Sequence, residues 1–213
     1  MTPSEQSQAT LALCQLAPVI PVLVVSDLAQ ARPLAEALVT GGLPVLEVTL
    51  RTDCALDAIA AMAEVDGAVV GAGTVLSPAQ MTEARAAGAR FAVSPGATSA
   101  LLDASRIEAL PLLPGAQTCS EIMYLLEQGY NVQKFFPAEA IGGAAALASI
   151  AGPLPQATFC PTGGISAERA PDYLALSNVA CVGGSWVVPK AALAEGDWSA
   201  ITALARDAAT LAR

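Results

Sequence analysis

The chain has 213 residues, of which 54% are hydrophobic and 14% are charged, and its formal net charge is −9. This composition is typical of a compact globular protein and excludes a largely disordered one. The acidic balance and the absence of a basic stripe argue against nucleic acid and anionic membranes as partners, and no apolar run approaches the length of a membrane span.

Apolar, β-rich runs recur along the chain and alternate with alanine-, leucine- and glutamate-rich segments of helical spacing. A helix is predicted first, over about residues 4–15. Gly41, Gly88 and Gly129 stand where three of the later helices are expected to end. The eight predicted strands cover residues 19–25, 44–50, 67–73, 90–96, 110–115, 132–137, 158–164 and 178–184.

Eight strands that alternate with helices predict a parallel sheet, and eight is the number that closes a (β/α)8 TIM barrel. We therefore expect one α/β domain over residues 1–213, with the extra N-terminal helix and a barrel over about residues 18–213. A two-layer open α/β sheet is the alternative. In a barrel, the active site lies at the C-terminal ends of the strands.

The five cysteines are scattered and form no C-x-x-C pair, which is typical of reduced thiols in the cytoplasm and argues against a zinc site or a disulfide framework. The first ten residues, MTPSEQSQAT, lack the basic segment of a signal peptide. The chain has no histidine, so catalytic triads and histidine metal ligands are excluded. Acid–base chemistry must come from carboxylates, lysine, tyrosine or water.

The second predicted strand, VLEVTLRT, places polar side chains in a row. Alternation along a strand sends Glu47, Thr49 and Arg51 to the interior while Leu46 and Val48 face the helices. Buried polar groups are costly without partners. One reading is a structural ion pair between Glu47 and Arg51. The other makes Glu47 an acid–base group and Arg51 an anion clamp near the mouth.

The sixth predicted strand, VQKFFPAE, contains Lys134, one of only two lysines in the chain. Val132, Lys134 and Phe136 share one face of this strand. An inward Lys134 enters the same interior as Glu47, either to form an ion pair with it or to act as a nucleophile. Burial disfavours a charged amine, and an uncharged amine can attack a carbonyl and form a Schiff base that permits carbon–carbon cleavage.

Glycine pairs follow the last two predicted strands in PTGGIS and VGGSW. Loops at these positions hold phosphate in many TIM barrels, through backbone N–H groups and the N-terminus of a short helix. The alternative is a pair of plain turns. The segment GAGT brings Thr74 to the same mouth, either as a substrate ligand or as a turn residue.

Together the segments EVTLRT, GAGTV, SPG, KFFPAE, PTGGIS and GGSW resemble the bacterial 2-keto-3-deoxy-6-phosphogluconate (KDPG) aldolase family, the class I aldolases of the Entner–Doudoroff pathway. The likeness runs from about Pro18 to the last helix. It implies a metal-independent lyase without a cofactor, which cleaves KDPG to pyruvate and glyceraldehyde 3-phosphate. It also implies cleavage of 4-hydroxy-2-oxoglutarate (KHG), cytoplasmic location and a homotrimer.

By this resemblance Lys134 is the Schiff-base lysine and Glu47 the general acid–base. The other site residues implied by the family bind substrate or shape the pocket: Arg51 and Thr74 at the pyruvate carboxylate, Pro95 and Phe136 in the walls, Thr162 on the aldehyde side, and Gly163, Gly164, Gly184 and Ser185 at the phosphate. Gln117 and Ile141 depart from the family pattern, which has smaller or more polar residues there.

Two rival functions remain open. A phosphosugar isomerase or epimerase on the same barrel would use the same phosphate loops but would need paired acid–base groups. A non-catalytic barrel that binds a phosphorylated ligand would hold Lys134 and Glu47 in a permanent ion pair. The configuration preferred at C4 and the relative activity on KHG also stay open.

Overall fold

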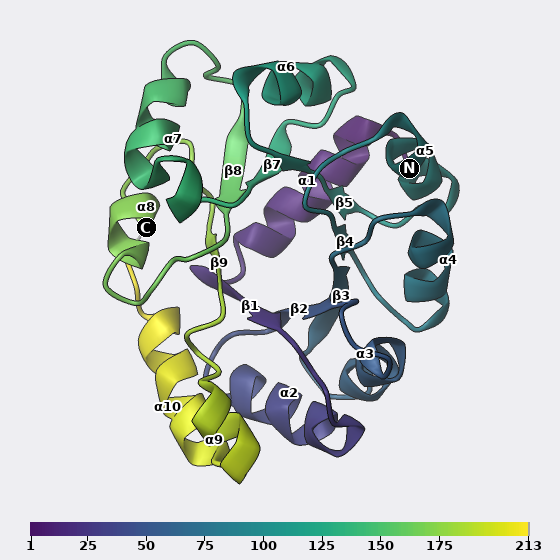
Figure 1. The fold of residues 1–213 in the computed structure, drawn as a ribbon, viewed down its shortest axis with the longest axis vertical. Coiled ribbons are helices and arrows are strands. Elements are labelled where there is room, and N and C mark those ends of the chain that lie inside the picture. Colours follow the sequence, from purple (N-terminus) through teal and green to yellow (C-terminus); the bar gives the residue numbers. More distant parts are fainter. Residues whose placement is uncertain (213) are drawn as a thin grey trace.

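Every strand pairing in the structure, a computed structural model that describes residues 1–212, is parallel. The strands form two curved sheets, with helices on their outer side (Figure 1). The larger sheet has the strand order β5-β4-β3-β2-β1-β9 and the smaller has the order β6-β7-β8. The strands are β1 (Val19–Leu23), β2 (Val45–Thr49), β3 (Val69–Gly73), β4 (Ala92–Val93), β5 (Leu112–Leu113), β6 (Gly115–Ala116), β7 (Val132–Phe135), β8 (Thr158–Pro161) and β9 (Val182–Gly184).

Each of the eight predicted runs contains a strand, but the fifth is divided in two. Strand β5 pairs with β4, strand β6 pairs with β7, and Pro114 stands between them. Proline has no N–H group to give to a sheet, so the ladder is interrupted at this residue. The carbonyl of Pro114 still accepts a hydrogen bond from the Lys134 N–H at 2.8 Å. The chain thereby passes from the larger sheet to the smaller one.

Helices follow most of the strands and have the boundaries that the glycines predict. Gly88 and Gly129 have positive φ directly after helices, as expected, whereas after α2 the left-handed residue is Gly42 and not Gly41. The helices are α1 (Pro3–Cys14), α2 (Ala31–Thr40), α3 (Ala55–Ala63), α4 (Pro78–Ala86), α5 (Ser99–Ile107), α6 (Cys119–Glu127), α7 (Gly143–Ala151), α8 (Ala170–Leu174), α9 (Lys190–Glu195) and α10 (Trp198–Ala209), with the short 3-10 turns η1 (Leu28–Gln30) and η2 (Glu139–Ile141).

Two apolar clusters lie on opposite sides of the strands. Strand β2 shows the division, because Leu46 and Val48 pack in the cluster that contains helix residues, while Val45 belongs to the other. The second cluster fills the space enclosed by the strands with Cys14, Ile20, Val45, Phe91, Val93, Leu113, Val132, Cys160 and Cys181. Its members come from six strands, from α1, and from Phe91 and Cys181, which directly precede β4 and β9, so they hold both sheets together.

Helix α1 covers the N-terminal ends of the strands, and Figure 1 shows it crossing the middle of the ring of strands. A capping box of Thr2 and Glu5 starts the helix one residue before the predicted boundary. Its inner side is polar. The Gln6 Oε1 accepts from the Leu112 N–H at 3.1 Å, and the Ser7 Oγ accepts from the Asn131 N–H at 3.0 Å. These bonds satisfy backbone N–H groups at the start of β5 and just before β7.

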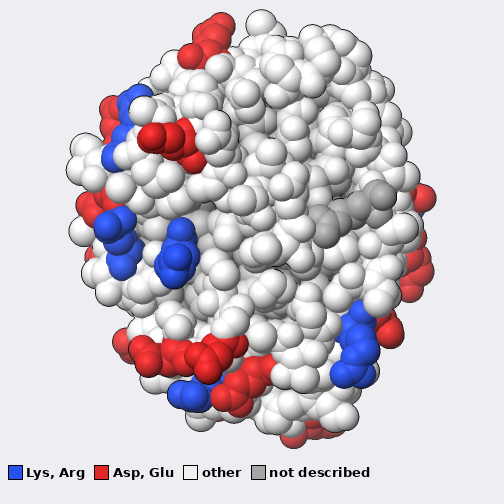
Figure 2. Space-filling view, turned by 180° about the vertical axis from the view of Figure 1, so that it is seen from behind, with Lys and Arg blue, Asp and Glu red and all other residues white. Residues whose placement is uncertain are grey.

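Within residues 1–212, no helix is long and apolar enough to cross a membrane. On the face of the molecule shown in Figure 2, most charged side chains lie toward the periphery. Acidic residues gather along the lower edge, and most of the few Lys and Arg side chains lie on the left side.

Gly41 allows α2 and α10 to pack closely, because a Cβ at this position would meet the Cβ of Ala205 and would lie 2.8 Å from the Thr202 carbonyl oxygen. We predict that Gly41→Ala lowers the free energy of unfolding by about 1–3 kcal/mol, the usual cost of overpacking. The matched control is Gly152→Ala, where a Cβ meets nothing within 4 Å and the backbone is right-handed. Urea unfolding should show no loss for the control, and equal losses in both variants would contradict this packing argument.

Candidate active site

The centre of the site is a buried ion pair between Lys134 of β7 and Glu47 of β2. The Lys134 Nζ lies 3.2 Å from the Glu47 Oε1, and the two residues are only 5% and 3% exposed. The inward orientation predicted for both side chains is confirmed. The alternative ion pair of Glu47 with Arg51 is wrong, because the carboxylate pairs with Lys134 across the enclosed space.

Strand β3 leaves room for this carboxylate. Gly73 pairs in register with Thr49 of β2, and a Cβ on Gly73 would collide with the Glu47 Oε1 and lie 2.6 Å from its Cγ. Only glycine therefore fits beside the Glu47 side chain in its present position.

Arg51 and Thr74 meet where β2 and β3 end. The Arg51 Nε donates to the Thr74 Oγ1 at 3.3 Å. Thr74 has a φ of 58°, in the left-handed region that a β-branched residue rarely adopts. Such strain is typical of functional sites. The contact places a guanidinium and a hydroxyl side by side at the carboxyl ends of the strands.

A cavity of about 520 Å³ opens at this end of the strands. Phe136 connects it to the ion pair, since the Lys134 Nζ lies 5.2 Å from the centroid of the Phe136 ring. Of the residues expected in the site, seven line this cavity: Arg51, Phe136, Thr162, Gly163, Gly164, Gly184 and Ser185. The other four, Glu47, Lys134, Thr74 and Pro95, do not. The Pro95 backbone instead packs against Gly115, which pairs in register with Lys134.

The glycines after β8 adopt the backbone that glycine alone takes readily, with φ values of 108° at Gly163 and 79° at Gly164. Gly184 is covered by the Trp186 ring, which would collide with a Cβ there. Two short helices follow these loops in the chain. Helices α8 and α9 begin only at Ala170 and Lys190 and are five and six residues long.

Hydrogen bonds from Ala138, Glu139 and Tyr173 support the glycine loop from behind, and this set of contacts, here called the brace, was not predicted from the sequence. The Ala138 N–H donates to the Thr162 carbonyl at 2.8 Å, and the Glu139 N–H donates to the Gly163 carbonyl at 3.0 Å. The Tyr173 hydroxyl of α8 donates to the Glu139 Oε1 at 2.5 Å. Burial, reinforced by this hydrogen bond, raises the pKa of Tyr173 well above its ordinary value, so the hydroxyl stays a donor. In the sequence, the only sign of this brace was Glu139, the acidic residue at the end of KFFPAE.

No group of three histidine, cysteine, aspartate or glutamate residues in the described part of the chain is placed to hold a metal ion. The chemistry that this arrangement offers is that of an amine and a carboxylate in contact, below a cavity with a cationic rim and a glycine-rich wall.

A family model described as KDPG and KHG aldolase matches residues 11–204. The chain belongs to this family. It is 58% identical over 192 residues to the KHG/KDPG aldolase of Escherichia coli strain K12, a match that covers 90% of each chain.

Solved structures of KDPG aldolases have the same fold as this family member. The enzyme of Zymomonas mobilis ZM4 with 3-phosphoglycerate superposes with a TM-score of 0.90 at 52% identity, over 95% of both chains. The enzyme of Legionella pneumophila, with pyruvate captured at low pH as a covalent carbinolamine intermediate, superposes with a TM-score of 0.91 at 50% identity, over 94% of this chain and 98% of that one.

The brace leads to a stability prediction. Tyr173→Phe removes the donor to the half-buried Glu139 carboxylate, and we expect the free energy of unfolding to fall by about 1–3 kcal/mol. Tyr124→Phe is the control, because it removes a solvent-exposed hydrogen bond to Ser99 and should cost less than about 0.5 kcal/mol. Urea unfolding of both variants measures the difference. If both variants lose equally little free energy of unfolding, the Tyr173–Glu139 hydrogen bond makes no net contribution to stability.

Proposed function

We propose that this chain is a class I aldolase that cleaves KDPG to pyruvate and glyceraldehyde 3-phosphate, and KHG to pyruvate and glyoxylate. The observation that carries the proposal is the buried contact of the Lys134 amine with the Glu47 carboxylate beside the 520 Å³ cavity. The names of close relatives, the KHG/KDPG aldolase of Escherichia coli among them, support the choice of substrates.

The first half of the reaction joins the substrate to the enzyme. Glu47 is placed to take a proton from the Lys134 amine across their 3.2 Å hydrogen bond. The free amine attacks the ketone carbon and forms a carbinolamine, and Glu47, directly or through water, returns a proton so that the hydroxyl leaves as water. The product is a protonated imine. The carbinolamine captured in the Legionella enzyme supports this sequence of steps.

In the second half, the protonated imine withdraws the electrons of the C3–C4 bond. A base, Glu47 or a water held by it, takes the proton of the C4 hydroxyl, the C3–C4 bond breaks, and glyceraldehyde 3-phosphate leaves. The remaining enamine takes a proton at C3, and water then hydrolyses the imine to release pyruvate and regenerate Lys134. Each step needs only an amine, a carboxylate and water, which suits a chain without histidine.

The other site residues are proposed to bind the two ends of the substrate. Arg51 and Thr74, joined by a hydrogen bond at the mouth, bind the pyruvate carboxylate. Thr162 is proposed to lie on the aldehyde side and Phe136 to limit the pocket, whereas Pro95 would act from behind, through its packing against Gly115. The phosphate is held by the cavity wall made of Gly163, Gly164, Gly184 and Ser185.

We propose that the two sheets belong to one closed (β/α)8 barrel and that residues 1–213 form a single domain. Isolated parallel bridges pair Phe159 with Val179 and Thr162 with Gly183, which supports closure between β8 and β9. At the other seam, β5 and β6 follow each other through Pro114. The family resemblance supports a homotrimer, and the scattered cysteines support a cytoplasmic location.

Treatment with pyruvate and borohydride tests the mechanism directly. We expect one stable adduct, mapped by mass spectrometry to Lys134 and not to Lys190, because only Lys134 contacts a carboxylate that can accept its proton. Lys134→Arg should form no adduct and lose turnover, since a guanidinium stays protonated. An adduct on Lys190, or none on the wild-type chain, would overturn the Schiff-base mechanism and favour a non-catalytic barrel or an isomerase.

The role of Glu47 is tested by two variants. Glu47→Gln keeps the shape of the side chain and should slow KDPG cleavage by roughly 100-fold or more, the scale of lost general acid–base catalysis. Gly73→Ala should slow KDPG cleavage to a similar extent although Glu47 and Lys134 are both retained, because the new Cβ displaces the Glu47 carboxylate.

Gly96→Ala, where a Cβ meets nothing within 4 Å, is the control for Gly73→Ala and should keep near-normal turnover. Near-normal turnover of folded Glu47→Gln would move the proton transfers to another group.

A further inference from the structure

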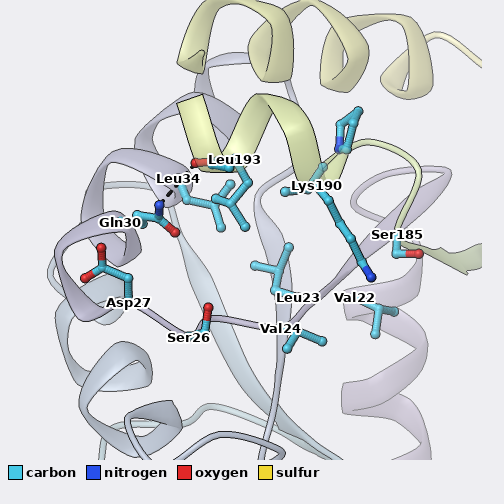
Figure 3. Close-up of a pocket in the computed structure, with 13 residues that line it drawn as sticks. Val22, Leu23, Val24, Ser26, Asp27, Gln30, Leu34, Ser185, Lys190 and Leu193 are labelled. Carbon is cyan, nitrogen blue, oxygen red and sulfur yellow. Dashed lines mark hydrogen bonds between the residues drawn. The ribbon is translucent and has the colours of Figure 1, made fainter. Parts of the chain in front are cut away.

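A second cavity adjoins the first and is shown in Figure 3. Its volume is about 580 Å³, and it lies between β1, the start of α2 and the segment that leads into α9. The two cavities share Val22, Val24 and Ser185 in their linings. Ser185 belongs to the wall proposed to hold phosphate, so the second cavity begins where the phosphate end of the substrate would lie.

Lys190 stands at the edge of this second cavity. Figure 3 shows its side chain running from the start of α9 across the cavity, with the amine directed to the side on which Val22 and Ser185 lie. Its ammonium group has no ion-pair or hydrogen-bond partner within the residues that the structure describes. The positive charge of Lys190 is therefore not neutralised by a carboxylate in direct contact.

Two other polar side chains of this cavity, Asp27 and Gln30, already have hydrogen-bond partners. The Asp27 Oδ1 accepts from the Ala29 N–H at 3.0 Å at the start of η1, and the Gln30 Nε2 donates to the Leu193 carbonyl at 3.1 Å. Figure 3 shows both side chains on the opposite side of the cavity from the Lys190 amine. The rest of the lining is largely apolar, and walls of low polarity concentrate the field of a nearby charge.

The two cavities hold one cation each. Arg51 is the only lysine or arginine that lines the first, and Lys190 is the only one that lines the second, among the residues described. A phosphorylated keto acid carries negative charge at both ends. With Arg51 at the carboxylate, the neutral N–H groups of the glycine wall would face a phosphate without any positive side chain.

We infer that Lys190 is the side-chain cation for the phosphate and that it makes the site select phosphorylated substrates over unphosphorylated ones. This inference rests on the proposed function and adds to it a residue outside the catalytic pair and the glycine wall. Lys190 is exposed, so its flexible four-carbon stem is free to extend to the phosphate, and its contribution is weakened by salt.

The experiment compares Lys190→Ala and Lys190→Arg with the wild-type chain on KDPG and on KHG. We expect Lys190→Ala to raise KM for KDPG about fivefold, the scale of one charge contact at an exposed site, with kcat unchanged. KHG also has a second carboxylate, but this group is bonded directly to C4 and ends short of the phosphate position. The kcat and KM of Lys190→Ala for KHG, and its adduct with pyruvate and borohydride, should therefore match the wild type. Lys190→Arg should restore most of the affinity for KDPG, and 0.5 M salt should narrow the gap between wild type and Lys190→Ala.

Arg85→Ala is the matched control, because it makes the same change in net charge on α4, outside both cavities. An equal rise in KM for both substrates, or an equal effect of Arg85→Ala, would overturn the role of Lys190 while leaving the aldolase mechanism intact.

Calorimetric titration with 3-phosphoglycerate gives a readout that does not depend on turnover. Lys190→Ala should bind this probe about fivefold more weakly than the wild type does. If the wild-type chain cleaved neither substrate, the proposed function would fail, and the titration would still show whether Lys190 binds phosphate. Equal affinity of both proteins for the probe would overturn the inference.

Discussion

The structure depends on one buried contact, the ion pair of Lys134 and Glu47. A charge removed from water is tolerated only beside a partner, and loss of either partner leaves the other uncompensated. Because Glu47 is on β2 of the larger sheet and Lys134 is on β7 of the smaller one, the pair requires both sheets to keep a fixed separation. The same contact supplies the amine and the proton acceptor that Schiff-base chemistry needs.

Small residues around the pair follow from this requirement. Gly73 leaves space for the Glu47 carboxylate, Gly183 leaves space for Thr162, and Gly115 lets the Pro95 backbone approach β6. At each position a Cβ would occupy a volume already taken by a site residue or its support. The interior near the Lys134 amine thus depends on the absence of side chains at these glycines as much as on the side chains present. Below it, the apolar cluster closed by Cys14 of α1 keeps the pair away from water on the opposite side.

Recognition of a substrate with two anionic ends by an acidic chain needs local positive charge at both ends. We propose that the Arg51–Thr74 contact provides it on one side of the mouth and that Lys190 provides it on the other. The glycine wall between them is held from behind by backbone hydrogen bonds to Ala138 and Glu139 and by the bond from Tyr173. In this proposal, binding is divided between the glycine loop and two cations, Arg51 and Lys190.

The sequence by itself determined the alternation of eight apolar runs with helices, and it determined the inward faces of β2 and β7, because side-chain direction along a strand follows from residue parity. It also pointed to Lys134, since a rare lysine among apolar residues needs a chemical reason. Only the tertiary structure decided that Glu47 pairs with Lys134 and not with Arg51, that Pro114 divides the fifth strand, and that Tyr173 braces Glu139. It alone brought Lys190 to a cavity beside Ser185. These contacts join segments far apart in the chain, and their distances depend on how strands and helices pack, which no local pattern of residues encodes.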